Sequence, residues 1–359
     1  MKIINKLLLA PKDFKPSLEE LEIDGVLNPA AIRLPNKKIM LYVRVAESYI
    51  NRDSKKPWQF PIIISKDNYE TISEEIPEEE IESRDRNVIY LKSGICRLTN
   101  ISHFRKVILK EDGFKVESIS QTPDFTGIPG DEEYGVEDPR ITKIGSNYLM
   151  TYVSISKKNG ISTSLVLSSD LKKWKRKGII FSEQNKDCVL FPEKIDGKYV
   201  AFHRPETLFE FSKPGIWISH SKDLIYWGKE QSVLKPRLKS WESERVGSGA
   251  PPIKTEKGWL LLYHGVYLKN EKVVYSVGAA LFDLKHPEKI IARSPQDKPL
   301  IKPLKPYEKK GYTSNVIFPT GAIQSLNKKD LVIYSGGADS VVSVQKIAIK
   351  DILKSMEYY

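Results

Sequence analysis

The chain has 359 residues, of which 40% are hydrophobic, 10% aromatic and 29% charged, an ordinary globular composition that can bury a large core. Lysine and arginine exceed aspartate and glutamate by 57 − 46 = 11, so the protein is basic and suits anionic partners such as nucleic acid, an acidic membrane surface or phosphate. The cations are scattered without a run of five or six, which favours a solvated surface. We therefore expect no nucleic-acid partner.

Cys96 and Cys188 are too few and too far apart to make a disulfide scaffold or a zinc site. The N-terminal sequence MKIINKLLLAPKDF has a four-residue apolar run before Pro11. A secretory signal needs about 7–15 apolar residues and a membrane-spanning helix about 20. We expect a cytoplasmic protein with no membrane partner, and the sequence leaves a homo-oligomer open.

Short segments rich in Val, Ile, Tyr, Phe and Trp, separated by turns rich in Gly, Asn, Asp and Lys, predict strands along most of the chain. One pattern recurs five times: a strand, a tight polar turn and an aromatic-rich strand. In chain order the units are residues 30–45, 140–155, 193–205, 251–266 and 321–339. A further strand, turn and strand follow three of them, at 166–181, 218–234 and 279–293. A short helix is predicted at 351–359.

Five units of about four strands each predict an all-β fold, a five-bladed β-propeller that forms a single domain over residues 1–359. The longer interval after the first unit predicts that residues 46–120 carry an insertion as well as the outer strands of blade one. The rival architecture, a two-sheet sandwich, would not explain five similar units. Because the first strands of propeller blades converge on one channel, functional residues should lie at equivalent places in several units.

Asp138 lies in the sequence YGVEDPRI, just before the inner strand of the second unit. Pro139 restricts the residue before it, so we expect Asp138 to be extended and rigidly presented beside Arg140. A carboxyl group held in this way suits a general acid. The alternative is a turn-forming Asp-Pro pair with a surface ion pair.

In the third unit, Lys186 and Arg204 flank strands that are otherwise apolar, and such cations are rarely buried without a partner. His264 takes the matching place in the fourth unit, although a histidine that follows an apolar strand is more often structural. Three more polar residues occupy matching places in the first and fifth units: Asn28, Arg44 and Asp339. No metal, nucleotide-binding or serine-hydrolase motif is present.

The sequence resembles glycoside hydrolase family 130, the β-mannoside phosphorylases and their relatives, from residues 28–34 to 336–340. The motifs that carry the resemblance are SHFR (102–105), YGVEDPRIT (134–142), NKDCVLFPEKIDGKYVAFHRP (185–205), GSGAPPIKTEKGWLLLYHGV (247–266) and NVIFPTGA (315–322). The chain departs from the family pattern after Arg44, where the segment from Glu47 to Pro57 is longer and more charged.

The resemblance implies a five-bladed propeller in which Asp138 is the proton donor, acting through the mannose 3-hydroxyl. It also implies two binding sets. The sugar-binding set is Asn28, Arg44, Arg105 and Asp339. The phosphate-binding set is Lys186, Arg204, His264 and Tyr275. No cofactor is implied, and inorganic phosphate is a co-substrate.

Phosphorolysis is favoured over hydrolysis because phosphate is already an anionic nucleophile and needs basic side chains rather than a carboxylate base. We expect the reversible release of α-mannose 1-phosphate from β-mannosides. An inverting β-mannosidase and a non-catalytic carbohydrate-binding propeller are the alternatives. Because Lys186, Arg204 and His264 would repel one another without an anion, the free site is expected to be strained and to take up phosphate or sulfate.

Overall fold

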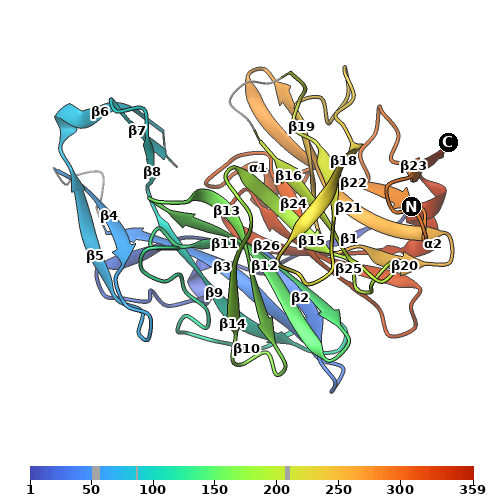
Figure 1. Cartoon of the computed structure of the whole chain (residues 1–359), viewed down its shortest axis with the longest axis horizontal. Helices are drawn as coiled ribbons and strands as arrows, with labels where there is room; N and C mark the ends of the chain where they lie inside the picture. Colours follow the sequence, from blue (N-terminus) through green and yellow to red (C-terminus); the bar gives the residue numbers. More distant parts are fainter. Residues whose placement is uncertain (51–56, 86–87, 207–210) are drawn as a thin grey trace.

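The computed structural model of the protein describes residues 1–50, 57–85, 88–206 and 211–359, and it is dominated by strands (Figure 1). The described strands form five sheets of four or more strands and two smaller sheets. The predicted all-β class is confirmed, whereas the two-sheet sandwich is wrong for these strands. In the ranges that the structure describes, no helix is long and apolar enough to cross a membrane.

Each large sheet is antiparallel, and most of its neighbouring strands follow one another along the chain. The first sheet contains β2 (Leu21–Arg33), β3 (Ile39–Tyr49), β9 (Ile101–Leu109) and β10 (Val116–Ile119). The second contains β11 (Val136–Ile144), β12 (Asn147–Ser156), β13 (Gly160–Ser168) and β14 (Lys175–Phe181). The third contains β15 (Asn185–Leu190), β16 (Tyr199–Pro205), β17 (Ile216–Ser221) and β18 (Trp227–Leu234).

The fourth and fifth sheets add strands from the two ends of the chain. The fourth contains β19 (Arg245–Ser248), β20 (Ile253–Thr255), β21 (Gly258–Lys269), β22 (Lys272–Phe282), β23 (Ile290–Arg293) and β27 (Glu357–Tyr358). The fifth contains β24 (Ile317–Gln324), β25 (Asp330–Gly337), β26 (Val341–Ala348) and β1 (Ile4–Leu9). Because β1 pairs with β26, the fifth sheet joins the N-terminal strand to the C-terminal part of the chain.

The two small sheets lie between β3 and β9 and project away from the five large sheets at the left of Figure 1. They consist of β4 (Trp58–Ile63), β5 (Thr71–Ile76), β6 (Ile81–Arg84), β7 (Val88–Leu91) and β8 (Cys96–Leu98). Within the predicted 46–120 range, the outer strands β9 and β10 complete the first sheet. Most of the charged segment from Glu47 to Pro57 lies outside the described residues.

Helical segments are few and short in the part of the chain that the structure describes. They are η1 (Pro11–Asp13), η3 (Glu78–Glu80), α1 (Pro306–Lys309) and α2 (Ile349–Lys354). The C-terminal helix predicted at 351–359 is therefore misplaced, since α2 begins at Ile349 and ends at Lys354. The helix buries Ile349 and Ile352, whereas Glu357–Tyr358 pairs with β23 as a strand.

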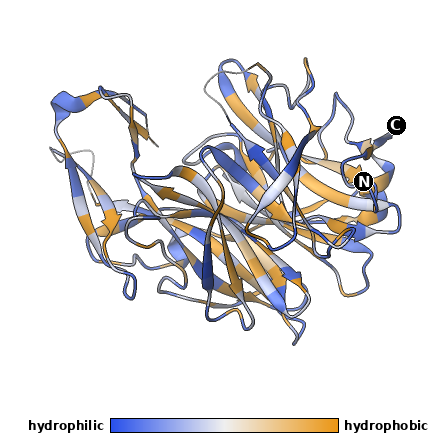
Figure 2. Cartoon of the chain, in the orientation of Figure 1, coloured by the Kyte–Doolittle hydropathy of each residue, from blue (hydrophilic) through white to orange (hydrophobic). Residues whose placement is uncertain are grey.

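Apolar side chains fill the junctions between consecutive large sheets, and hydrophobic stretches run along their strands in Figure 2. Pairs that share a cluster across each junction, in sheet order, are Phe104 and Tyr152, Leu149 and Leu190, Phe202 and Phe282, Leu262 and Ile317, and Val332 and Val43. The fifth sheet thus packs against the first. This packing fixes each sheet's first strand relative to those of its neighbours.

The first strand of each of the first three sheets has a bulge at the same place. The register shifts lie between Leu27 and Ala30, between Glu137 and Arg140, and between Lys186 and Val189. Inside these bulges, Asn28, Asp138 and Asp187 adopt the left-handed conformation, with φ of 43°, 49° and 56°. Asn and Asp tolerate this region better than most residues, and bulges re-aim side chains. The repeated bulges therefore present three polar side chains in one direction.

The extended conformation predicted for Asp138 on the strength of Pro139 is wrong, because the φ of Asp138 is 49°. The bulge between Glu137 and Arg140 overrides the local preference that proline imposes on the preceding residue. The rigid presentation of Asp138 therefore comes from the sheet rather than from the dipeptide.

Phe202→Ala should destabilise the protein by about 3–5 kcal/mol, since Phe202 is fully buried between the third and fourth sheets, with ring centroids 4.8 Å from Phe191 and Phe282. Denaturant unfolding would measure the loss. Leu326→Ala, at an exposed position, is the control and should change stability by less than about 0.5 kcal/mol. Equal effects of the two substitutions would contradict this view of the core.

Candidate active site

A polar cavity of about 310 Å³ is lined by residues from all five large sheets or the loops beside them. Eight of the nine residues predicted from the sequence line it: Asn28, Arg44, Asp138, Lys186, Arg204, His264, Tyr275 and Asp339. They come from distant parts of the chain, as the repeat pattern predicted. The structure therefore brings the predicted acid, the predicted phosphate set and three of the four predicted sugar-binding residues to one place.

Arg105 is the exception and does not line the cavity. Its guanidinium is fully buried and donates to His103 Nε2 (2.9 Å), to the Lys15 carbonyl (2.7 Å) and to Glu47 Oε1 (3.1 Å). Ser17 Oγ and another carbonyl take its remaining donor capacity. With its donors used in this way, Arg105 holds the N-terminal segment against β9, and the structure does not bring it to the other predicted sugar-binding residues.

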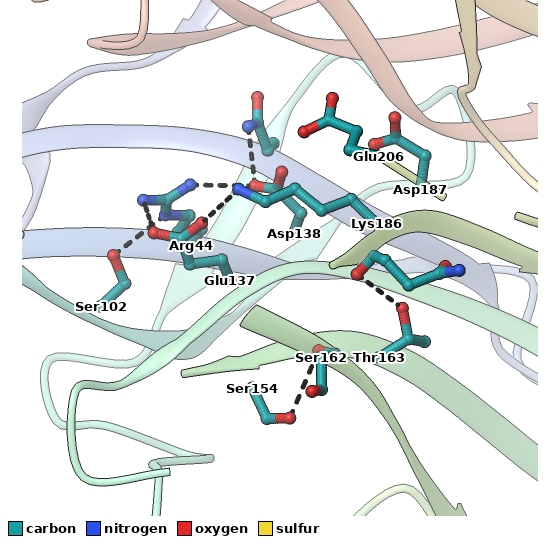
Figure 3. Close-up of polar contacts among 12 residues, drawn as sticks. Arg44, Ser102, Glu137, Asp138, Ser154, Ser162, Thr163, Lys186, Asp187 and Glu206 are labelled. Carbon is teal, nitrogen blue, oxygen red and sulfur yellow. Dashed lines mark hydrogen bonds and ion pairs between the residues drawn. The ribbon is translucent and has the colours of Figure 1, made fainter. Parts of the chain in front are cut away.

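Asp138 lies at the centre of a hydrogen-bonded group at one end of the cavity (Figure 3). Its Oδ1 accepts from Asn28 Nδ2 at 2.8 Å and from Arg44 Nη1 at 3.1 Å. Arg44 Nη2 donates to Glu137 Oε1 at 2.6 Å, and Lys186 Nζ lies 3.8 Å from Glu137 Oε2. Two adjacent carboxylates thus share two cations.

Burial acts to raise the pKa of Asp138, but the charges of Arg44 and Arg140, the hydrogen bond from Asn28 and the charge of Lys186 outweigh it. The pKa of Asp138 therefore lies below its ordinary value, and the group is ionised in the free site at neutral pH. A general acid must be protonated before it acts. A ligand that offsets the neighbouring cations would act to raise this pKa and so favour the protonated form that the role needs.

Asp339 behaves in the opposite way. Burial raises its pKa, and the carboxylates of Asp138 and Glu137 push in the same direction, against the Thr313 hydrogen bond and the Arg44 charge. The pKa values of the two carboxyl groups are thus shifted in opposite directions, so that Asp138 is the more readily ionised and Asp339 the more readily protonated.

The other end of the cavity is built on Asp187. Its carboxylate accepts from Arg204 Nε at 2.6 Å and from Arg140 Nη2 at 3.3 Å, and it lies 3.7 Å from His264 Nε2. These groups pack so tightly that a Cβ at Gly247 would overlap both Asp187 and His264. The charge of Arg204 holds the pKa of Asp187 well below its ordinary value despite burial. Asp187 is therefore a permanent anion that fixes the Arg204 side chain.

His264 is neutral in the free site. Burial lowers its pKa to about 3, and the charges of Arg204 and Arg245 act in the same direction, outweighing Asp187. Its Nδ1 is buried and has no hydrogen-bond partner among the described residues. The imidazole can therefore offer a donor to a ligand, and a bound anion would favour its protonated form.

The electrostatic strain predicted for the free cationic site is wrong, because each cation has a carboxylate nearby. Lys186 pairs with Glu137, and Arg204 pairs with Asp187 and with Glu206. Arg245 Nη1 lies 3.4 Å from Glu206 Oε1, and its Nη2 donates to Tyr275 Oη at 2.5 Å. An incoming anion must therefore share or replace existing ion pairs.

Sequence reasoning missed five charged residues at or beside the site: Glu137, Arg140, Asp187, Glu206 and Arg245. Glu137 and Asp187 had a sequence signal, because the pairs Glu137-Asp138 and Lys186-Asp187 occupy equivalent positions in two units. Arg245 had no such signal, since β19 is only four residues long and shows no clear strand pattern. Among the described residues, no group of three or more His, Cys, Asp or Glu side chains could hold a metal ion.

An all-β chain that gathers carboxyl groups, arginines, a lysine and a histidine from separate sheets into one polar cavity has the features of a carbohydrate-processing enzyme. Comparison with known families identifies which one. The model of the glycoside hydrolase 130 family, described as beta-1,4-mannooligosaccharide phosphorylase, matches residues 111–358. The chain belongs to glycoside hydrolase family 130.

Curated relatives and a solved structure agree. A beta-1,2-mannobiose phosphorylase of Listeria innocua is 34% identical over 98% of this chain and 96% of that protein. A 1,2-beta-oligomannan phosphorylase of Thermoanaerobacter sp. is 43% identical over 61% of this chain and 70% of that protein. The crystal structure of beta-1,2-mannobiose phosphorylase from Listeria innocua with beta-1,2-mannobiose superposes with a TM-score of 0.88 at 33% identity, covering 99% of both chains.

The buried neutral imidazole predicts a pH effect on stability. Between about pH 6.5 and pH 3 the unfolded chain binds a proton at this histidine that the folded chain refuses, so the free energy of unfolding falls as the pH falls. His264→Asn should flatten the stability curve between pH 5 and 6 by up to about 1.4 kcal/mol per pH unit. Denaturant unfolding across that range would measure it.

His286→Asn, at an exposed position outside the cavity, is the matched control and should keep the wild-type slope. Parallel stability curves for the wild type and His264→Asn would contradict the assignment of a neutral, buried His264.

Proposed function

We propose that the protein catalyses the inverting, reversible phosphorolysis of β-mannosides, mannobiose or manno-oligosaccharides, by inorganic phosphate, and releases α-mannose 1-phosphate. The proposal rests on family membership and on one observation of the structure. A single cavity joins an Asp138–Asn28–Arg44 group at one end to Arg204, His264 and Arg245 at the other. The names of the relatives support mannosides as the sugars and phosphate as the nucleophile.

We propose further that the five large sheets are the blades of one five-bladed β-propeller domain. Two features support the proposal. Each sheet shares an apolar cluster with the next, and the fifth shares one with the first. In addition, β1 completes the fifth sheet, as expected where the two ends of a chain meet in a closing blade. The cavity then lies where the first strands converge.

In this proposal, Asp138 is the proton donor, acting through the mannose 3-hydroxyl, while Asn28, Arg44 and Asp339 hold the mannosyl unit. Lys186, Arg204, His264 and Tyr275 bind phosphate. To the phosphate set we add Arg245, which lines the cavity and donates to the Tyr275 hydroxyl. The geometry supports this division, because the buried ion pair of Arg204 with Asp187 aims a fixed guanidinium at the cavity.

Phosphate suits this site better than water does. An inverting hydrolase needs a second carboxylate, about 6.5–9.5 Å from the acid, to activate water. Phosphate needs charge-assisted donors instead, and arginine presents them in a fixed fork. Because Lys186 is among the cations that lower the pKa of Asp138, an anion bound to Lys186 would act to raise that pKa and favour protonation of the acid.

Hydrolysis remains the second candidate, because one observation favours it. The Glu206 carboxylate lies at the phosphate end of the cavity, where it could take a proton from water. β-1,2-Linked mannobiose is the first substrate to test, since the relatives that cover the chain best carry that linkage in their names.

The deciding experiment incubates the protein with β-1,2- and β-1,4-mannobiose, with and without phosphate. We expect α-mannose 1-phosphate only when phosphate is present, and synthesis of a defined linkage when α-mannose 1-phosphate meets a panel of acceptors. Free mannose released equally fast without phosphate would establish the hydrolase instead. Binding without turnover of any mannoside would establish a carbohydrate-binding protein.

Asp138→Asn should keep the fold and the binding of mannoside but lower kcat by about 10²–10⁴-fold, because the amide is nearly isosteric and cannot deliver a proton. Steady-state phosphorolysis together with mannoside titration would separate binding from turnover. Asp24→Asn, which changes another acidic residue lining the cavity, is the comparison and should retain far more activity. Activity within a few-fold of wild type in Asp138→Asn would exclude Asp138 as the proton donor.

A further inference from the structure

Glu206 places a carboxylate on the basic end of the cavity. It follows the last residue of β16, and its backbone N–H donates to the Gln184 carbonyl at 3.0 Å, so the side chain starts from an anchored point. Its Oε1 forms ion pairs with Arg204 Nη1 and with Arg245 Nη1, the latter at 3.4 Å. Figure 3 shows Glu206 among the polar groups of the site.

The two carboxylates that Arg204 engages differ in kind. The Asp187 side chain is 2% exposed and also accepts from Arg140, so it is locked in place. The Glu206 side chain is 22% exposed, and the ion pairs that it forms with described residues are those with Arg204 Nη1 and Arg245 Nη1. Asp187 therefore builds the site, whereas Glu206 occupies donors that face the cavity and can be released to solvent.

We propose that Glu206 is an affinity-setting residue, an internal anion that competes with phosphate for Arg204 and Arg245 and must leave them before phosphate binds. The inference rests on the proposed function, in which these arginines hold phosphate. An intramolecular competitor lowers the apparent affinity by the fraction of molecules whose site is open. If the closed form holds about nine tenths of the free enzyme, phosphate binds on the order of tenfold more weakly than the open site allows.

Competition by Glu206 would let the site keep its cations close together and still remain free of other anions. Cations gathered without an anion would repel one another and would collect any anion in the cell. A tethered carboxylate keeps the arginines oriented and neutralised while the site is empty. Since Glu206 competes for the empty site, removing its charge should strengthen the binding of every anion that fits the site by the same factor.

The test uses Glu206→Gln, which removes the charge with little change of shape at a partly exposed position. Calorimetric titration of the mannoside-free protein with inorganic phosphate, and separately with sulfate at matched ionic strength, should show Kd values lowered about tenfold for both anions. The KM for phosphate should fall in the same direction. Glu206→Asp keeps the charge but shortens the reach, and should give a smaller gain.

Glu117→Gln is the matched control, because Glu117 pairs with Lys38 at the surface, away from the cavity, and its loss should leave the phosphate Kd unchanged. A phosphate Kd that is unchanged or higher in Glu206→Gln would overturn the inference. A loss of phosphate binding with unchanged sulfate binding would also overturn it, and would make Glu206 an acceptor for protonated phosphate. If the wild type binds neither anion and turns over mannoside without phosphate, the proposed function fails, and the inference fails with it.

Discussion

The site depends on the hydrogen bonds of one buried group, the guanidinium of Arg140. It donates to the Asp138 carbonyl at 2.6 Å, to Asp187 Oδ1 at 3.3 Å and to the Gly249 carbonyl at 3.2 Å, so one side chain joins the second and third sheets to the loop after β19. Removing one partner of such a buried pair typically costs about 3–5 kcal/mol, because the other charge is left buried alone. Arg140 directly follows the bulge in β11, so the packing of the sheets also sets the geometry of the cavity.

Charge in the cavity is arranged as pairs rather than as a basic patch. Arg44 and Lys186 share Glu137, whereas Arg204 has the fixed anion Asp187. Fixed pairs hold the long side chains in one rotamer, so less conformational freedom is lost when a ligand binds. A basic site of this kind is preorganised by its own carboxylates, and its affinity for an anion is the difference between two sets of ion pairs.

The fold and much of the site could be predicted from the sequence because the repeated units show where the strands lie and which positions are equivalent. Strand–turn–strand units gave the sheets, and equivalent positions in those units gave Asp138, Arg204 and His264. The position of Arg105 outside the cavity could not be read from the SHFR motif, because it depends on the packing of the N-terminal segment around the Arg105 guanidinium. Arg245 and Glu206 could not be predicted, since they meet across two sheets and local patterns do not record such pairings.

The protonation of Asp138 shows how the two ends of the cavity depend on each other. With the cations of the site unoffset by a ligand, Asp138 is held ionised, which is the wrong state for a proton donor. In the proposed function, phosphate would bring negative charge to Lys186, weaken the pull of that cation on Asp138, and so act to raise the pKa of Asp138. The same charge would favour protonation of His264, whose buried Nδ1 has no partner within the described ranges. Coupling between two ligands is reciprocal: if phosphate strengthens the binding of a proton to Asp138, protonation of Asp138 strengthens the binding of phosphate by the same factor. Phosphate binding and protonation of the acid are then linked. The site would then become competent to cleave a mannoside only once its second substrate is in place, which suits a phosphorylase and would have no counterpart in a hydrolase.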